Sequence, residues 1–376
     1  MTKTKVVIIH NIVSPHVSTL FKEIAKRVDL TVLYCAERES NRSWSEFPSG
    51  FKYKVLKNFS IKFQGKDLFT YFINLTIFKE LNQIKPDLII IAGWDLFAYQ
   101  MAFLYCKFKK IKIILWSGST KFEPSWRRNL SLPLVRLIVK NSDSFLAYGK
   151  RAREYLETLG APENKITIAY NVTDVWKNFN PDNLQAKSEI KKKLDLADER
   201  VIFYYGQLIE RKGVDLLIKA FKLLREKHKK VKLVIVGSGN YKERLLKLSE
   251  HDRSDDTVFL PDLGDRSTSE YFRAADLFVL PSKEEVWGLV VNMAMAYGLP
   301  VIVSSAAGSS ADLVKNGKNG YVFKTGSVKD LVSKITLAIS DKQKLMEMGE
   351  SSLKTIQDFT PQKTAAAILS SIASLV

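Results

Sequence analysis

Cysteine and histidine are scarce in this chain of 376 residues, which contains two cysteines and four histidines. Cys35 and Cys106 are far apart and lie in apolar surroundings without the spacing of metal ligands. We therefore expect two small core residues, with neither a disulfide nor a bound metal. The absence of a disulfide framework is typical of proteins of the reducing cytosol.

Long apolar runs are also lacking. The segment 88–105 is a candidate membrane span, but Asp95 and Gln100 interrupt it, and it is better interpreted as a strand, a turn and a helix. The apolar stretch at 6–9 is too short for a signal peptide. Low-complexity tracts and fixed-period repeats are absent as well. These absences predict a globular cytoplasmic protein without a transmembrane segment.

Acidic residues are outnumbered by basic ones. Lys and Arg total 58 against 40 Asp and Glu, which gives a net charge of +18 and a pI near 9.6. Such a field attracts polyanions, namely nucleic acid, anionic lipid headgroups or phosphorylated substrates. Each local run of lysines, such as 191–193, is equally explained as a solvated helix face. The overall excess predicts an anionic membrane surface as a partner, with the protein peripheral on the inner face of the membrane.

Short apolar runs alternate with amphipathic stretches throughout the chain, which is typical of parallel α/β sheets. The alternation stops in a polar, lysine-rich segment and then restarts. We predict an N-terminal Rossmann-like domain at 1–175, a linker at 176–199 and a C-terminal Rossmann-like domain at 200–359. A last helix is predicted within 360–376, and it can pack on the N-terminal domain or on the C-terminal domain. The predicted strands are 5–9, 30–34, 88–92, 111–115, 144–147, 166–169, 201–205, 233–236, 258–260, 277–280, 301–303 and 321–323.

The segment after the predicted strand 201–205 carries the strongest candidate site. Gly206 permits a tight exit from the strand, and a helix is predicted to begin near Val214. Free N–H groups at a helix start, together with Arg211 and Lys212, suit a diphosphate. The alternative is a glycine-capped loop with two exposed cations. The spacing is that of neither a Walker loop nor a dinucleotide fingerprint.

A second candidate follows the predicted strand 277–280. Glu284 and Glu285 precede Gly288, which allows a close approach of the backbone to a ligand. A carboxylate here can accept hydrogen bonds from sugar hydroxyls or stabilise positive charge at an anomeric carbon. Capping of the following helix explains the same glutamates equally well. The small-residue segment 304–310 is either room for a ligand or a plain loop.

The N-terminal half offers weaker signals. His16, in the loop predicted at 11–16, is a candidate acceptor contact, although a lone histidine is more often structural. Trp116 and Ser117 follow another predicted strand, 111–115, and are candidates for the same acceptor-side surface as His16. The cluster Trp126–Arg128 suits a lipid interface, and an exposed helix start explains it equally well.

Taken together, the motifs resemble those of retaining glycosyltransferases of family 4. The segment 206–215 is similar to the family's G-R/Q-L-x-x-x-K-G-x-D diphosphate loop, and 285–302 is similar to its E-x7-E region. The segments 143–149 and 171–174 are similar to its interdomain segments. The resemblance implies the GT-B fold, in which two Rossmann-like domains face each other across a cleft. It also implies transfer of a sugar from a nucleotide-diphosphate sugar to a glycan, glycolipid or lipid-linked acceptor in surface polysaccharide or glycoconjugate synthesis.

The resemblance also implies roles for individual residues. Lys212 and Arg211 would hold the diphosphate, and Glu285 would contact the transferred sugar. No cofactor or metal would be needed, because two cations and a helix terminus neutralise the leaving group. The implied donor-binding residues are Gly206, Gln207, Asp262, Leu263, Trp287, Gly288, Leu289 and Met293. The acceptor-side candidates are His16, Trp116, Ser117 and Asn171.

The sequence departs from the family pattern at three points. Met293 stands where the second motif glutamate holds ribose hydroxyls, and a thioether cannot replace the acceptor oxygens of a carboxylate. Gln207 replaces a frequent arginine, and the glycine-rich first loop is absent. Met293 motivates an alternative, a catalytically degenerate GT-B subunit that binds a partner or a glycan. A sugar-nucleotide epimerase would need additional acid and base residues at the sugar, and none is identifiable in this sequence. A nucleic-acid binder would leave the diphosphate loop unexplained.

Overall fold

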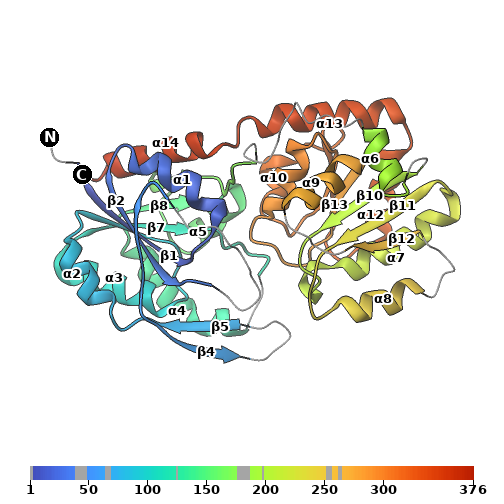
Figure 1. The fold of residues 1–376 in the computed structure, drawn as a ribbon. Helices are drawn as coiled ribbons and strands as arrows, with labels where there is room; N and C mark the ends of the chain where they lie inside the picture. Colours follow the sequence, from blue (N-terminus) through green and yellow to red (C-terminus); the bar gives the residue numbers. More distant parts are fainter. Residues whose placement is uncertain are drawn as a thin grey trace. The chain divides into compact units, whose positions relative to one another are not determined.

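The computed structural model describes residues 3–38, 49–63, 69–123, 126–175, 187–196, 199–250, 256–260 and 265–376. The chain forms two compact units. The first unit comprises Met1–Asp174 and Thr360–Val376, and the second comprises Val175–Phe359. Each unit contains a parallel β-sheet with helices packed on it (Figure 1). The predicted α/β class with two Rossmann-like domains is confirmed.

The first unit is built on a seven-stranded sheet in the order β3-β2-β1-β6-β7-β8-β9. In its central strand, Val6 and Ile8 face one side while Val7 and Ile9 face the other, and all four are fully buried. Apolar side chains on both sides of a strand require cover on both faces of the sheet. The strands are β1 (Lys5–Ile12), β2 (Asp29–Ala36), β3 (Lys52–Val55), β6 (Leu88–Ile91), β7 (Lys112–Ser117), β8 (Ser144–Ala147) and β9 (Ile166–Ile168).

Helices cover both faces of this sheet. Helices α1 (Pro15–Ala25) and α14 (Pro361–Ala373) share one core cluster, so the C-terminal helix packs on the first unit. A hydrogen bond of 3.0 Å between the hydroxyls of Ser144 and Ser371 fixes α14 to β8. The other face is covered by α2 (Ile77–Ile84), α3 (Phe97–Lys109), α4 (Trp126–Lys140) and α5 (Lys150–Thr158), and the short helix η1 (Glu163–Lys165) precedes β9.

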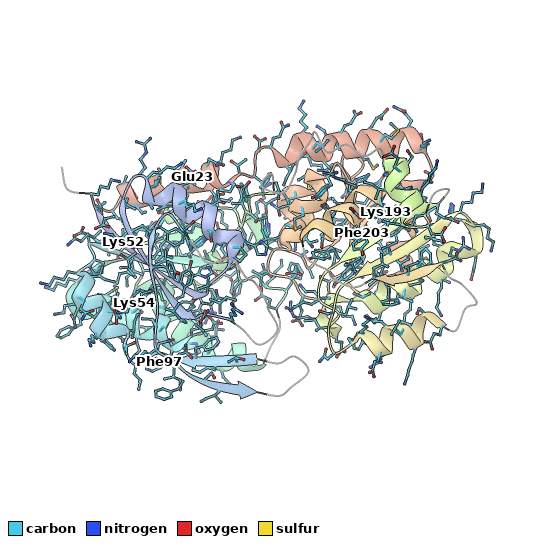
Figure 2. The ribbon with its side chains drawn as sticks, viewed as in Figure 1. Glu23, Lys52, Lys54, Phe97, Lys193 and Phe203 are labelled. Atoms are coloured by element: carbon cyan, nitrogen blue, oxygen red, sulfur yellow. The ribbon has the colours of Figure 1, made fainter. Side chains whose placement is uncertain are left out.

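Three strands of the first unit lie outside the predicted set. Strands β4 (Phe59–Phe63) and β5 (Phe69–Ile73) form an antiparallel pair, and helix α2 begins only at Ile77. The amphipathic pattern of 68–84 predicts a helix over that whole stretch, but the aromatic and β-branched run at 69–73 favours a strand. The edge strand β3 is polar, and its Lys52 and Lys54 are paired with carboxylates (Figure 2).

The second unit contains a six-stranded parallel sheet in the order β12-β11-β10-β13-β14-β15. Phe203 of β10 packs edge-on against Phe272, with ring centroids 5.0 Å apart, inside this unit (Figure 2). The strands are β10 (Arg200–Tyr205), β11 (Val231–Val236), β12 (Thr257–Leu260), β13 (Leu277–Leu280), β14 (Val301–Ser304) and β15 (Gly320–Phe323). The helices are α6 (Lys187–Lys193), η2 (Glu210–Lys212), α7 (Val214–Lys227), α8 (Lys242–Glu250), α9 (Asp265–Ala274), α10 (Leu289–Ala296), α11 (Ser310–Leu313), α12 (Val328–Ile339) and α13 (Lys342–Ile356).

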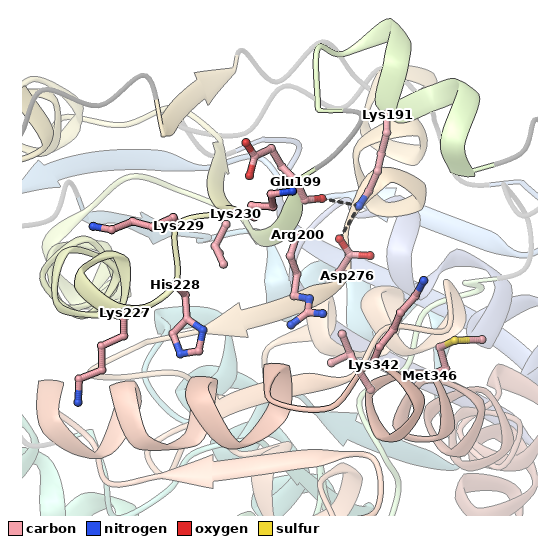
Figure 3. Close-up of a pocket in the computed structure, with 12 residues that line it drawn as sticks. Lys191, Glu199, Arg200, Lys227, His228, Lys229, Lys230, Asp276, Lys342 and Met346 are labelled. Atoms are coloured by element: carbon pink, nitrogen blue, oxygen red, sulfur yellow. Dashed lines mark hydrogen bonds and ion pairs between the residues drawn. The ribbon is translucent and has the colours of Figure 1, made fainter.

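The later part of the predicted linker is a helix of the second unit. Helix α6 packs on α9, and its Lys191 is bonded to Asp276 at 2.6 Å (Figure 3). Asp276 also accepts hydrogen bonds from Lys187 at 2.7 Å and from the backbone N–H of Val201 at 2.8 Å. This carboxylate joins α6, β10 and β13, so the segment from 187 onward is anchored to the second unit. The preceding part of the linker, 176–186, lies outside the described residues.

We expect Asp276→Ala to lower the free energy of unfolding by about 3–5 kcal/mol, because it removes the carboxylate that pairs with two lysines and accepts from a backbone N–H. Burial alone would raise the pKa of Asp276, but Lys187 and Lys191 outweigh it and hold the pKa below 3.8. Burial lowers the pKa of Lys187 more than the neighbouring Asp276 raises it.

A lowered carboxyl pKa stabilises the fold above the pKa of the unfolded chain, and the stabilisation is lost as the pH falls through the folded pKa. The difference in Tm between wild type and Asp276→Ala should therefore be constant from about pH 5 upward and shrink below about pH 4. Thermal unfolding between pH 3 and pH 7 measures it. A difference that does not change with pH would contradict this assignment.

Candidate functional site

The site lies where the strand order of the second sheet reverses direction. From β10 the chain proceeds to β11 and β12 on one side, and it then returns to β13 and continues to β14 and β15 on the other. In open parallel sheets, this switch point forms a crevice outside the carboxyl ends of the two central strands. The loops after β10 and β13 carry the predicted diphosphate and sugar residues, and they are therefore neighbours in space.

The loop after β10, residues 206–213, is called here the cationic loop. It contains η2, and Gly213 at its end has φ +67°, with a Cβ-equivalent position only 2.2 Å from the carbonyl oxygen of Pro281. Only glycine tolerates both this backbone conformation and this contact. The backbone N–H groups of Lys283 and Glu284 donate to the carbonyl of Arg211, at 2.8 and 3.3 Å. The backbones of the two loops are thus held together.

The loop after β13, residues 281–288, is called here the acidic loop. Its Glu285 forms an ion pair with Lys212, and both side chains are about nine-tenths buried at 13% and 14% exposure. The hydroxyl of Ser282 lies 3.5 Å from the same carboxylate oxygen. A second pair joins Lys283 to Asp215 of α7 at 3.1 Å. Each loop therefore presents a charged group to the other at the edge of the sheet.

Tyr204 lies beneath this pair of charges. Burial and the carboxylate of Glu285 raise the pKa of Tyr204, and the nearby Arg211 opposes them. The phenol therefore stays protonated, and it donates a hydrogen bond of 2.9 Å to the carbonyl of Gln207. Arg211 and Glu285 thus both act electrostatically on the buried phenol of Tyr204.

The end of the acidic loop is fixed from inside the unit. The indole of Trp287 is 2% exposed and donates to the side-chain carbonyl of Asn292 at 3.0 Å. Gly288 has φ +92°, and a Cβ there would lie 2.7 Å from Leu280. Trp287 thus packs in the core, while Gly288 and Leu289 turn the chain into α10. Helix α7 begins at Val214, as predicted, and the N-termini of α7 and α10 both lie at the switch point.

The small-residue segment 304–310 packs against the acidic loop. The N–H of Gly308 donates to the carbonyl of Glu285 at 3.1 Å, and the N–H of Ser309 donates to that of Trp287 at 3.1 Å. A Cβ at Gly308 would lie 2.0 Å from the carbonyl oxygen of Val286. These small residues support the backbone beside Glu285. The hydroxyls of Ser309 and Ser310 are buried and have no hydrogen-bond partner among the described residues.

Two predicted donor contacts, Asp262 and Leu263, lie outside the described residues. Met293 is half-buried in the second turn of α10, following the acidic loop. Gly206 ends β10, and its N–H bonds to the carbonyl of Val236 at 3.1 Å. Of the predicted site residues, the structure therefore brings Lys212 into an ion pair with Glu285, and it bonds the backbone of Arg211 to the acidic loop.

The predicted acceptor-side residues lie at the ends of strands of the first sheet or follow them. Helix α1 begins at Pro15, so the loop predicted at 11–16 is shorter than expected and His16 is the second residue of the helix. The Nδ1 of His16 lies 3.4 Å from the hydroxyl of Thr173. Trp116 and Ser117 are buried at the end of β7. The N–H of Asn171 donates to the carbonyl of Tyr148 at 3.3 Å. Trp126–Arg128 start α4, but their side chains lie outside the description.

Sequence reasoning missed one pair in the first unit. The strand order of its sheet reverses between β1 and β6, and Trp94 and Asp95 follow β6 at that point. Trp94 packs near Tyr155, with ring centroids 6.4 Å apart, and Asp95 is exposed. The sequence signal that could have identified this pair is an aromatic residue and a polar residue shortly after a strand of four apolar residues. They belong with His16 on the candidate acceptor side.

Among the described residues, no three His, Cys, Asp or Glu side chains converge as a metal site would require. None of the described helices combines the length and the apolar character of a membrane span.

Comparison with protein families assigns both units. The family model described as Glycosyltransferase Family 4 matches residues 13–177, and the model described as Glycosyl transferases group 1 matches residues 186–355. The chain belongs to glycosyltransferase family 4. Its cationic and acidic loops lie within the group 1 match, and the acceptor-side candidates lie within the family 4 match.

Individual relatives are distant. The chain is 30% identical over 195 residues to an uncharacterized glycosyltransferase of Haemophilus influenzae, covering 52% of this chain and 54% of that protein. It is 24% identical over 292 residues to sulfoquinovosyl transferase SQD2 of Arabidopsis thaliana, covering 75% and 56%. The chain thus spans about half the length of these relatives. Anabaena HepE, solved in complex with UDP, has the same GT-B fold, with a TM-score of 0.77 at 18% identity over 99% of this chain and all of HepE.

Proposed function

We propose that this family 4 chain transfers a sugar from a nucleotide-diphosphate sugar, with retention of configuration at the anomeric carbon. The observation that carries this proposal is the Lys212–Glu285 pair, which joins the cationic loop to the acidic loop at the switch point. A cation and a carboxylate in contact suit a ligand that carries an anionic group next to a polyhydroxylated one. A nucleotide-diphosphate sugar is such a ligand.

The reaction we propose takes place on one face of the sugar. The bond between the anomeric carbon and the diphosphate oxygen breaks, and its electron pair leaves with the diphosphate. Lys212, Arg211 and the N-terminus of α7 neutralise the charge that develops on this leaving group. The acceptor hydroxyl forms its bond to the anomeric carbon on the face that the diphosphate leaves, and its proton passes to the departing phosphate oxygen. Glu285 orients the sugar, and no metal or other cofactor takes part.

The acceptor we propose is a glycan, a glycolipid or a lipid-linked sugar in surface polysaccharide or glycoconjugate synthesis, handled at the inner face of the membrane. It would bind to the first unit, where His16 and Asp95 present polar groups beside the switch point of the sheet. The structures of HepE with UDP and with UDP-glucose make uridine nucleotides the first donors to test.

The proposal is tested by isothermal titration of the full chain with UDP, UDP-glucose and the corresponding guanosine and adenosine nucleotides. We expect saturable binding of at least one nucleotide diphosphate, and release of that nucleotide from its sugar in the presence of a glycan or lipid-linked acceptor. Binding without hydrolysis or transfer would favour the alternative, a degenerate subunit that binds a partner or a glycan. The absence of any nucleotide binding would contradict both the donor site and its proposed chemistry.

Met293 makes a second measurement possible. A methionine offers no acceptor to the ribose hydroxyls that the family glutamate holds at this position. Charge-assisted hydrogen bonds contribute about 1.5–3 kcal/mol each, so Met293→Glu should tighten the binding of UDP by about tenfold or more. Met293→Gln, with a neutral acceptor, should produce a smaller gain. Unchanged affinity in both variants would show that the ribose does not lie beside α10.

A further inference from the structure

Large apolar side chains are exposed on three neighbouring helices of the first unit. Leu104 and Phe108, one turn apart on α3, are 52% and 82% exposed. On α4, three leucines recur at the spacing i, i+4 and i+7, which places them on one side of the helix. We call this surface the exposed helix face, and it comprises Phe78, Leu104, Phe108, Leu130, Leu134 and Leu137.

The three helices belong to one layer. Leu81 of α2, Ala102 of α3 and Ile138 of α4 belong to one core cluster on the same face of the sheet, so the opposite sides of these helices all point away from it. The rings of Phe78 and Tyr105, 6.1 Å apart, connect α2 to α3. In Figure 1, α2 and α3 lie on the other side of the sheet from α1 and α14. The six apolar side chains therefore lie on one surface of the unit.

The charge of this surface has a single sign. Helices α3 and α4 contain no Asp or Glu, and the one carboxylate of α2, Glu80, is buried and paired with Lys54. The ammonium of Lys109 lies 5.5 Å from the ring centroid of Phe108, so cations and apolar groups are interleaved. The exposed basic residues of the three helices and their ends are Lys79, Lys85, Lys107, Lys109, Lys110, Arg136 and Lys140.

We propose that the exposed helix face docks this protein on an anionic lipid bilayer. Apolar side chains that enter the interface, surrounded by cations that meet the headgroups, are the two components of peripheral membrane binding. A monomeric surface seldom exposes six large apolar side chains on one layer of helices without a partner. A lipid surface accommodates apolar groups spread over three helices without a matching shape. Its negative charge complements a face that has no exposed carboxylate on these helices. This inference is independent of the donor site.

The test is co-sedimentation of the full chain with vesicles of phosphatidylcholine alone and with 30% phosphatidylglycerol. We expect binding to the anionic vesicles only. The variant Lys107→Glu/Lys109→Glu/Lys110→Glu should lower the partition coefficient by more than about a hundredfold, because each basic residue near an anionic surface contributes a factor of about five. Leu104→Ser/Phe108→Ser, which keeps every charge, should lower it by about tenfold or more.

A matched control comes from the second unit. Lys227, Lys229 and Lys230 are exposed around a cavity of about 700 Å³ at the end of α7, and Figure 3 shows them there. Their triple replacement by glutamate makes the same change in net charge as the α3 variant, and it should leave vesicle binding within about twofold. Equal losses in the two triple variants would show that the overall charge of +18 drives binding, and this would overturn the proposal.

Two further outcomes separate this inference from others. Absence of wild-type binding to anionic vesicles would refute the lipid assignment and leave a protein partner as the occupant of the face. UDP titration of the α3 variants should give the wild-type dissociation constant, because the exposed helix face contributes no residue to the donor site. If UDP fails to bind the wild type while the vesicle results hold, the proposed function fails and the membrane face stands.

Discussion

Replacing Lys212 with alanine is expected to lower kcat/KM for sugar transfer by about a thousandfold while the second unit stays folded. Removal of one preorganised group that stabilises developing charge typically costs a factor of 100–1,000, and Lys212 is in addition a full charge that is 14% exposed. Its neighbour Arg211 keeps one cation in the loop, so nucleotide binding should weaken less than the rate. Single-turnover kinetics and UDP titration separate the two effects.

Two variants serve as controls for Lys212→Ala. Lys283→Ala removes a cation of the same site that is paired with Asp215 at 3.1 Å, and we expect its rate within tenfold of wild type. Lys212→Arg keeps the charge and should restore part of the rate. Thermal unfolding shows whether the loss of the ion pair with Glu285 destabilises the unit. A rate for Lys212→Ala equal to that of Lys283→Ala would sink the assignment of Lys212 to the leaving group.

The sequence was sufficient to predict the central strands of both sheets. Strands such as β8 and β13 are short runs of buried apolar residues, and burial on both faces removes any ambiguity about which side is polar. Strand β3 escaped prediction because an edge strand with three exposed residues in four has no apolar pattern. Strand β5 escaped because its residues were included in an amphipathic stretch predicted at 68–84, whereas the helix there, α2, begins at Ile77.

The candidate site was predictable in its residues but not in its contacts. Motif spacing indicated Lys212 and Glu285 separately, 73 positions apart. Their ion pair depends on β10 and β13 being neighbours at the reversal of strand order, and strand order is a property of the whole sheet. Asp95 was missed for the same reason. The loop after β6 becomes a candidate site only because β6 lies next to β1 at the reversal of strand order. The roles of Trp287 and Gly308 likewise required the fold, because their contacts lie inside the unit.

We expect Glu285→Gln to reduce kcat by about a hundredfold or more without weakening the binding of UDP. The carboxylate is proposed to contact the transferred sugar, which UDP lacks, so the variant should lose affinity for UDP-sugar and not for the nucleotide. Because Lys212 is paired with Glu285 in the unliganded chain, removing the negative charge frees this cation for the diphosphate. UDP should therefore bind Glu285→Gln as tightly as wild type or more tightly.

This opposition between rate and affinity separates a sugar contact from a purely structural ion pair. If Glu285 served only to hold Lys212 in place, its replacement would weaken UDP binding, and kcat would fall in parallel. Glu284→Gln is the matched control, since its carboxylate is adjacent in sequence while its backbone N–H bonds to Arg211 at 3.3 Å, and its kcat should stay within about threefold. Titration with UDP and with UDP-glucose, beside single-turnover rates, measures all three quantities. Weaker UDP binding in Glu285→Gln would assign the carboxylate to the phosphate-binding turn instead of the sugar.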